Sequence, residues 1–303
     1  MILHYIWYFF IYAFLGWCTE VVYAAAKSGE FVNRGFLNGA YCPIYGFGVL
    51  FVVSVLEPVD NLFYLFAGAV LITSGIELVT GFVLEKAFHH KWWDYSDMPF
   101  NIGGYICLLF SMAWGLACLI VVDRIHPMVR SLVQSIPPAP GKVLLIGFAC
   151  LFLIDFIASV RTILNLNRRL EIMDEITLKI RESSDLIGEN LAHGTIALIQ
   201  KKDEIEEGLE ARREVVRIEL AEMRQESQKV LAHRRQALKE LRQARRELLE
   251  ATPFGQKRLL KAFPGLRSLR HNDALESLKN RVAQAMTPSR DQAMNHEEEA
   301  AAE

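Results

Sequence analysis

Long uncharged apolar runs alternate with short polar connections in the first half of the chain, up to about Leu164. A helix needs about 20 predominantly apolar residues to cross the hydrocarbon core of a bilayer, so such runs predict membrane-spanning helices. The run at 43–56 is the shortest of them. The sequence therefore predicts a transmembrane domain over residues 1–164, with spans at about 2–26, 43–56, 62–84, 102–122 and 143–164.

The pattern changes after Leu164, where about one residue in three is charged and acids nearly balance bases. Residues 165–251 lack proline and are rich in strong helix formers, which predicts long cytoplasmic helices. Gly188 and Gly194 predict an interruption between a helix near 165–187 and a second one near 196–251. The second helix has apolar residues at alternating spacings of four and three, including Val216, Leu220, Met223 and Val230. This spacing favours a coiled coil with gaps in its seam, and a solvated single helix is the alternative.

The end of the chain divides into two predicted segments. Residues 252–285 are basic and amphipathic, which is typical of a segment that docks on anionic headgroups or in a groove of a partner. Residues 286–303 are polar and acidic and are predicted to be disordered. The balanced charge of the tail argues against nucleic-acid binding. The predicted fold class is all-α, a polytopic membrane protein with about five transmembrane helices followed by a long charged cytoplasmic helical or coiled-coil region.

The positions of Lys and Arg predict the orientation in the membrane. The base-rich tail is expected in the cytosol by the positive-inside rule, and five spans then place the N-terminus outside. The connections 27–42 and 85–101 carry bases and are expected in the cytosol, whereas 57–61 carries none. The connection 123–142 contains Arg124, Arg130 and Lys142 and nevertheless falls outside in this topology.

Three acidic residues lie inside the predicted spans: Glu20, Glu77 and Asp155. A carboxylate at mid-bilayer costs on the order of 2.5 to 3.5 kcal/mol on insertion scales, so a compensating partner is expected for each. All three are predicted at a similar depth in the cytosolic leaflet, which would allow them to converge.

The connection 27–42 offers a partner for these acids. Its Arg34 is expected to pair with Glu20 or Glu77, with Asn33 alongside. Irregular backbone survives at membrane depth only when it is buried in protein or lines a wet cavity, and glycines permit the tight turns that re-entry needs. The expected turn residues are Gly35, Gly39, Pro43 and Gly46.

The second cytosolic connection, 85–101, adds Asp94, Tyr95 and Asn101 on the same side. Two or three acids around one base leave net negative charge, which suits a cation, a proton or an amine. A purely structural role, in which the Arg34 ion pair fixes the fold, is the alternative.

The remaining candidates point to no catalytic or metal chemistry. The five cysteines lack metal or redox spacing and are expected to pack as small apolar residues, and His89 and His90 are expected to be a solvated pair. No metal site and no cofactor are predicted. The chain lacks the Gly-x4-Gly-Lys-Ser/Thr loop that cradles nucleotide phosphates, so ATP is expected to act only through a separate ATPase subunit. Ser111 and Gly115 form a small-residue face suited to close helix contact in a homo- or hetero-oligomer.

Two stretches carry a resemblance to a known family, FLGWCTEVVYAAAKSGEFVNRGFLNGAYCPIYGFG and WWDYSDMPFNIGGYICLLFSMAWG. Over roughly residues 5–160 the chain resembles the CmpB-type membrane proteins, a bacterial family of ABC-transporter permeases. It departs from the family pattern at Ala40-Tyr41, where a Gly-Pro pair is expected, and this affects the local turn. The resemblance implies a transport component of a bacterial cell membrane and does not specify the solute.

Three classes of function follow. The first is a membrane-embedded, ABC-type permease subunit without its own ATPase and with a polar cavity open to the cytosol. The second is a membrane-anchored scaffold or sensor whose helical tail binds partners. The third, an intramembrane enzyme using Glu20 or Glu77 as acid or base, ranks last because no nucleophile is placed beside an acid.

Overall fold

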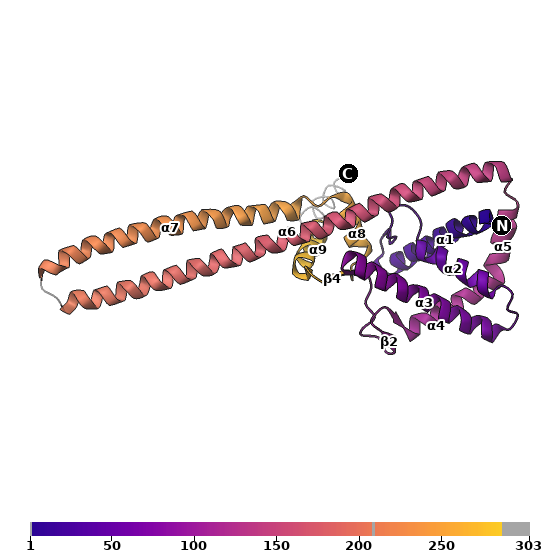
Figure 1. Cartoon of the computed structure of the whole chain (residues 1–303), viewed down its shortest axis with the longest axis horizontal. Helices are drawn as coiled ribbons and strands as arrows, with labels where there is room; N and C mark the ends of the chain where they lie inside the picture. Colours follow the sequence, from indigo (N-terminus) through magenta and orange to yellow (C-terminus); the bar gives the residue numbers. More distant parts are fainter. Residues whose placement is uncertain (1, 208–209, 287–303) are drawn as a thin grey trace, which may run out of the picture. The chain divides into compact units, whose positions relative to one another are not determined.

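The computed structural model describes residues 2–207 and 210–286 (Figure 1). The chain divides into two compact units. The first comprises the described residues up to Asn167 together with those from Pro253 onward, and the second comprises residues 168–252. Helices dominate both, and each strand in the described part of the chain has only two residues. The predicted acidic tail lies outside the described residues from position 287 onward.

Within the described residues, four helical segments are long and apolar enough to cross a membrane: Ile2–Ser28, Leu62–Phe88, Leu108–Gln134 and Pro138–Ile196. The first two are α1 (Ile2–Ser28) and α3 (Leu62–Phe88). The third joins α4 (Leu108–Ile120), a π-helical turn η1 (Val121–Ile125) and α5 (His126–Gln134). The fourth belongs to α6 (Pro138–Glu207). The chain therefore has the helices of a polytopic membrane protein.

The remaining predicted span is the short helix α2 (Pro43–Leu56), which has 14 residues. At 1.5 Å per residue it is about 21 Å long, shorter than the roughly 30 Å hydrocarbon core. The structure therefore does not confirm a fifth full span.

The segment that precedes α2 explains how so short a helix fits beside α1. The Cys42 N–H donates to the Ala13 carbonyl at 2.8 Å, and Ala13 is fully buried in the middle of α1. Ala13 lies 15 residues before the end of α1 at Ser28, or about 22 Å along the helix axis. The non-helical segment 29–42 therefore descends deep beside α1 before α2 begins, as the prediction of re-entry requires.

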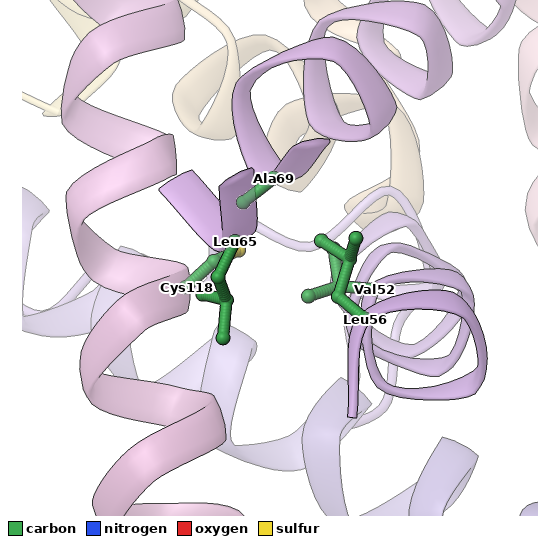
Figure 2. Packing of buried hydrophobic residues seen from close by; sticks show 5 residues of the cluster. All are labelled: Val52, Leu56, Leu65, Ala69 and Cys118. Carbon is green, nitrogen blue, oxygen red and sulfur yellow. The ribbon is translucent and has the colours of Figure 1, made fainter. Parts of the chain in front are cut away.

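Apolar side chains from three helices pack together in the first unit. Val52 and Leu56 of α2 meet Leu65 and Ala69 of α3 and Cys118 of α4 (Figure 2). Cys118 is 6 % exposed and all five cysteines are free thiols. Cys118 therefore packs as a small apolar residue, as predicted.

The small-residue face on α4 is used inside the chain. A Cβ added at Gly115 would lie 2.4 Å from Cγ2 of Val70 on α3. One turn earlier, the Ser74 hydroxyl donates to the hydroxyl of Ser111 at 2.8 Å. The close helix contact expected of Ser111 and Gly115 thus joins α4 to α3, and this face is not left for a contact between subunits.

The second unit is a helical hairpin. From Arg168 onward α6 continues to Glu207, and α7 (Glu210–Glu250) returns antiparallel to it (Figure 1). The predicted interruption at Gly188 and Gly194 is wrong, because α6 passes through both. Each glycine costs a helix about 1 kcal/mol, and the strong helix formers around them compensate. The side chains of Val216, Leu220 and Met223 lie outside the described set, so the coiled coil stays a prediction.

The segment from Phe254 to Met286, here called the C-terminal module, contains α8 (Phe254–Ala262), β4 (Arg267–Ser268) and α9 (Asn272–Met286). Strand β4 pairs antiparallel with β1 (His90–Lys91), which follows α3. Farther along the same connection, β2 (Asn101–Ile102) and β3 (Ile106–Cys107) form a small hairpin. Several apolar residues of the predicted amphipathic segment are buried within the first unit, namely Leu259, Leu266, Leu275 and Leu278, whereas Phe254 and Leu269 are exposed. Neither a membrane surface nor a partner is needed to cover the buried leucines.

Candidate functional site

An ion pair lies beside the re-entrant segment. Arg34 Nε is 3.3 Å from Oε2 of Glu20, and each side chain is about a quarter exposed. The Tyr45 hydroxyl, in the first turn of α2, donates to Oε1 of Glu20 at 2.6 Å. The guanidinium also lies over the Tyr23 ring, 5.1 Å from its centre. Of the two acids predicted to pair with Arg34, the structure selects Glu20.

Asn33 shapes the turn that presents Arg34. Its Oδ1 accepts hydrogen bonds from Trp17 Nε1 at 2.7 Å and from the Gly35 N–H at 3.1 Å. Its Nδ2 donates to the carbonyl of Asn38 at 2.8 Å. Because both ends of the amide are bonded within the protein, Asn33 acts here as a support of the turn.

Glu77, just past the middle of α3, is only 8 % exposed. The Tyr95 hydroxyl lies close enough to its carboxyl group to interact with it electrostatically, and its buried Oε2 has no hydrogen-bond partner among the described residues. Burial raises the pKa of Tyr95, and the carboxylates of Glu77 and, more weakly, Glu20 raise it further. Tyr95 thus lies within electrostatic reach of both acids.

We call the side chains of Glu20, Arg34, Tyr45, Glu77 and Tyr95 the acidic layer. It combines two carboxylates with one guanidinium and two phenols. Aromatic rings support both phenols: Tyr45 meets Trp114 edge to face at 5.4 Å, and Tyr95 stacks on Phe110 at 4.9 Å. A layer of this composition can hold a proton or a cationic group, because one guanidinium cannot balance two carboxylates.

Asp155, the third intramembrane acid, is held by the re-entrant segment itself. Its carboxylate accepts hydrogen bonds from the Gly39 N–H at 2.7 Å and from the Tyr41 hydroxyl at 3.0 Å. The Asn38 amide adds bonds from its side chain at 2.8 Å and from its backbone at 3.1 Å. Asp155 therefore pins the segment to α6, and its hydrogen-bonding capacity is used there rather than in the acidic layer.

Asp94 and Asn101 organise the second polar connection. Asp94 accepts hydrogen bonds from Ser96, whose backbone N–H is 3.1 Å away, and faces Lys91 at 3.8 Å and Arg267 at 3.3 Å. Burial alone would raise the pKa of Asp94, but the Ser96 bonds and the two cations lower it. The Asn101 amide donates to the Met98 carbonyl at 2.8 Å. Both side chains bond within this connection, and Asp94 also contacts Arg267 of the C-terminal module.

The predicted turn residues lie where the backbone comes close to other groups. A Cβ at Gly39 would be 2.5 Å from the Tyr41 ring, and one at Gly46 would be 2.8 Å from the carbonyl oxygen of Phe9 on α1. Pro43 begins α2, where its missing N–H costs nothing. Gly35 supplies a backbone N–H to Asn33.

Comparison with known families is decisive for the first half of the chain. The profile of a family described as "Putative ABC-transporter type IV" matches residues 7–160, about half of the 303 residues. The chain belongs to this family. The match includes Glu20, Arg34, Glu77 and Asp155, and it confirms the resemblance drawn from the sequence. No curated protein and no solved structure matched the chain.

Two parts of the site were missed by the sequence reasoning. Tyr45 was noticed only as part of the family pattern, and its position in the first turn after Pro43 was the available signal. The C-terminal module, outside the family match, also reaches the polar connections. Arg258 donates to the carbonyls of Gly35 at 2.9 Å and Phe36 at 3.2 Å, and no local pattern identifies a partner 223 residues away.

The histidine pair departs from its prediction. His90, expected to be solvated, is 1 % exposed in β1, and burial lowers its pKa. His89 ends α3 in the left-handed region with a φ of 58°. Among residues 2–207 and 210–286, no group of three or more His, Cys, Asp or Glu side chains is placed to bind a metal ion.

Proposed function

We propose that this chain is the membrane subunit of an ABC-type transporter and that its acidic layer contacts the transported solute from the cytosolic side. In this proposal the chain is not an enzyme and needs no cofactor of its own. ATP acts through a separate ATPase subunit, and the assembly is a homo- or hetero-oligomer. Family membership supports the transport assignment, and the geometry of Glu77 supports the position of the solute site.

The buried Oε2 of Glu77 is the observation that carries the proposal. A buried polar atom without a partner is costly, and natural structures contain few of them. An intramembrane carboxylate that serves only the fold is expected to be fully bonded, as Asp155 is. Glu77 instead retains an acceptor oxygen beside the Tyr95 hydroxyl, which suits a group that binds and releases a ligand.

The charge of the acidic layer favours a cation, a proton or an amine as the solute. Two carboxylates and one guanidinium leave an excess of one negative charge when all are ionised. Aromatic rings beside the acids add a favourable environment for an organic ammonium group. A cavity open to the cytosol around these groups is part of the proposal.

The orientation in the proposal keeps the N-terminus outside a bacterial cell membrane and the C-terminal part in the cytosol. This orientation places the three bases of connection 123–142 outside, which is contrary to the positive-inside rule. Arg130 forms an ion pair with Glu57, which follows α2, so one of these bases is accompanied by an acid on the same side. This pairing reduces the charge that would have to be placed outside.

A second candidate is a membrane-anchored scaffold or sensor. The observation in its favour is the compact helical hairpin of residues 168–252, which lies outside the family match. Such a unit presents long charged helices on which soluble partners can dock. In this alternative the membrane helices serve as an anchor.

Isolation of the complex from native membranes separates the two candidates. The tagged chain would be extracted in mild detergent beside a variant in which a short Gly-Ser linker replaces residues 168–252. Arg169 Nη2 lies 3.2 Å from the Thr252 hydroxyl, so the ends of the hairpin adjoin and a short linker can join them. The proposal predicts an ATP-binding subunit in stoichiometric amount with the full chain, and ATPase activity in the purified complex. Soluble partners without ATPase activity, lost with the hairpin, would establish the scaffold instead.

A further inference from the structure

The C-terminal module contacts both polar connections that carry the acidic layer. On the first connection, Arg258 of α8 binds the carbonyl oxygens of Gly35 and Phe36, and Lys261 bonds to Glu30 at 2.8 Å. On the second, β4 pairs with β1 and Arg267 faces Asp94. All of these contacts lie within the first compact unit.

Arg258 acts on the backbone next to the ion pair of the layer. Its two guanidinium bonds go to the two residues that follow Arg34, at 2.9 and 3.2 Å. Charged donors make the stronger class of hydrogen bond, and two parallel bonds from one guanidinium fix orientation as well as distance. The position of Arg34 against Glu20 therefore depends on a side chain outside the family match.

The second connection is held at the residues before Tyr95. His90 and Lys91 pair with Ser268 and Arg267, and the Leu269 N–H donates to the His89 carbonyl at 2.9 Å. Phe263 packs edge to face on Trp92, with ring centres 4.8 Å apart. Tyr95 leaves this anchored stretch to reach Glu77.

We propose that the C-terminal module is a clamp that holds both polar connections closed over the acidic layer, with Arg258 and Arg267 as its two locking side chains. When the clamp releases, Arg34 and Tyr95 withdraw from Glu20 and Glu77 and the layer opens to the cytosol. The inference rests on the proposed function only for the claim that the opened layer contacts the transported solute.

The two locks differ in strength, which suits a clamp that opens in steps. Arg267 is 62 % exposed, so its ion pair with Asp94 is screened by solvent and salt and contributes little alone. Arg258 is partly buried, and burial lowers its pKa while the charge of Asp155 opposes that shift. Helices α8 and α9 contact each other, which favours movement of the module as a body.

Native cysteines report each lock separately. Cys42 ends the first connection and is 6 % exposed, and Cys107, which pairs with Asn101 of the second connection directly before α4, is 1 % exposed. Cys118 lies in the packed cluster between α2, α3 and α4 and serves as the internal reference (Figure 2). The purified full chain would be treated with N-ethylmaleimide, and the labelling rate of each cysteine measured by mass spectrometry.

The clamp predicts a separate pattern for each variant. Arg258→Gln should raise the labelling rate of Cys42 about tenfold or more, because loss of a charge-assisted hydrogen bond shifts an opening equilibrium by that order. Arg267→Gln should raise the rate of Cys107 by a smaller factor, and Cys118 should stay unchanged in both. Lys257→Gln and Arg270→Gln, which alter exposed bases of the same module, are matched controls and should behave as wild type.

Two results would overturn the clamp. The first is unchanged labelling of Cys42 in Arg258→Gln together with unchanged labelling of Cys107 in Arg267→Gln. The second is a parallel rise at Cys118, which would mean that the module supports the whole bundle. The labelling measurement needs neither a solute nor an ATPase. The clamp can therefore be disproved while the transport proposal holds, and the transport proposal can be disproved while the clamp holds.

Discussion

At the scale of single residues, the two acids of the layer differ in how completely they are bonded. Glu20 has Arg34 and Tyr45 as partners, whereas Glu77 interacts electrostatically with Tyr95 and has one oxygen without a hydrogen-bond partner among the described residues. The Arg34–Glu20 pair is about a quarter exposed, so solvent weakens the attraction without removing it. Glu20 therefore contributes to the structure of the layer, and Glu77 is the better candidate for reversible binding.

His90 gives a prediction of pH dependence. Burial lowers its pKa below the usual value of about 6.5, so the folded state binds fewer protons than the unfolded state between these two pKa values. The pairing of β1 with β4 should be fully stable above about pH 6.5 and should weaken as the pH falls below it. Hydrogen exchange of the segment 265–271, corrected for intrinsic rates, should therefore speed up between about pH 7 and pH 5.

His90→Gln should remove most of this acid-induced exchange, because the neutral amide does not titrate. His89→Gln is the matched control, since His89 is the adjacent imidazole outside the buried position. Equal acid sensitivity in wild type and His90→Gln would show that another group weakens the pairing.

Sequence reasoning identified some of these residues for a physical reason. Charges in an apolar run must find partners, which made the pairing of Arg34 with Glu20 or Glu77 predictable. It could not choose between the two acids, because the choice depends on the exact depth of the re-entrant segment. Because the depth of the segment could not be predicted, Asp155 was expected to join the other two acids. In the structure it is bonded instead to Asn38, Gly39 and Tyr41.

At the scale of elements, the first connection and α2 together cross the depth that one long helix would cross. Segment 29–42 descends to the level of Ala13, and the 14-residue α2 continues from there. The hydropathy pattern predicts α2 because the helix is apolar. Its length, too short for a full span, indicates that a non-helical segment must cover the remaining depth. The non-helical segment brings free backbone N–H groups to Asp155, which a regular helix could not do because its interior N–H groups are bonded within the helix.

Gly46 tests this close packing of α2 on α1. A Cβ there would lie 2.7 Å from the Phe9 ring and 2.8 Å from its carbonyl oxygen, so Gly46→Ala should lower the free energy of unfolding by about 1 to 3 kcal/mol. Gly48→Ala in the same helix meets no atom within 4 Å and should be neutral or slightly stabilising. Thermal unfolding of both variants in detergent makes the comparison. Equal melting temperatures would contradict the close approach of the two helices.

Other elements were beyond the reach of local patterns. The glycines at 188 and 194 suggested a break, but a single glycine is a weak signal within a long run of helix formers. Amphipathicity suggested that residues 252–285 dock on anionic headgroups or in a groove of a partner, whereas several of their apolar residues are buried within the first unit of the same chain. The pattern could not show that the docking surface belongs to the same chain, because β4 meets β1 across more than half of the sequence.

At the scale of the whole molecule, the region that matches the family described as "Putative ABC-transporter type IV" is followed by two further parts. The family match covers residues 7–160 and includes the acidic layer. The C-terminal module packs on the same compact unit, and the hairpin of residues 168–252 forms a unit of its own. The sequence predicted a mostly helical chain with apolar helices long enough to cross a membrane, because composition and periodicity are local properties, but its five spans compare with four such helices among the described residues. Their tertiary contacts depend on long-range packing and required the structure.

The most direct test of the central claim measures ATPase activity of the complex after reconstitution into liposomes. Wild type would be compared with Glu77→Gln and with Asp60→Asn, which changes an exposed acid between α2 and α3. If the acidic layer contacts the solute, Glu77→Gln should assemble normally and lower the coupled ATPase rate about tenfold or more, as expected for loss of a buried charged contact, while Asp60→Asn keeps the wild-type rate. An assembled Glu77→Gln complex with the wild-type rate would contradict the account.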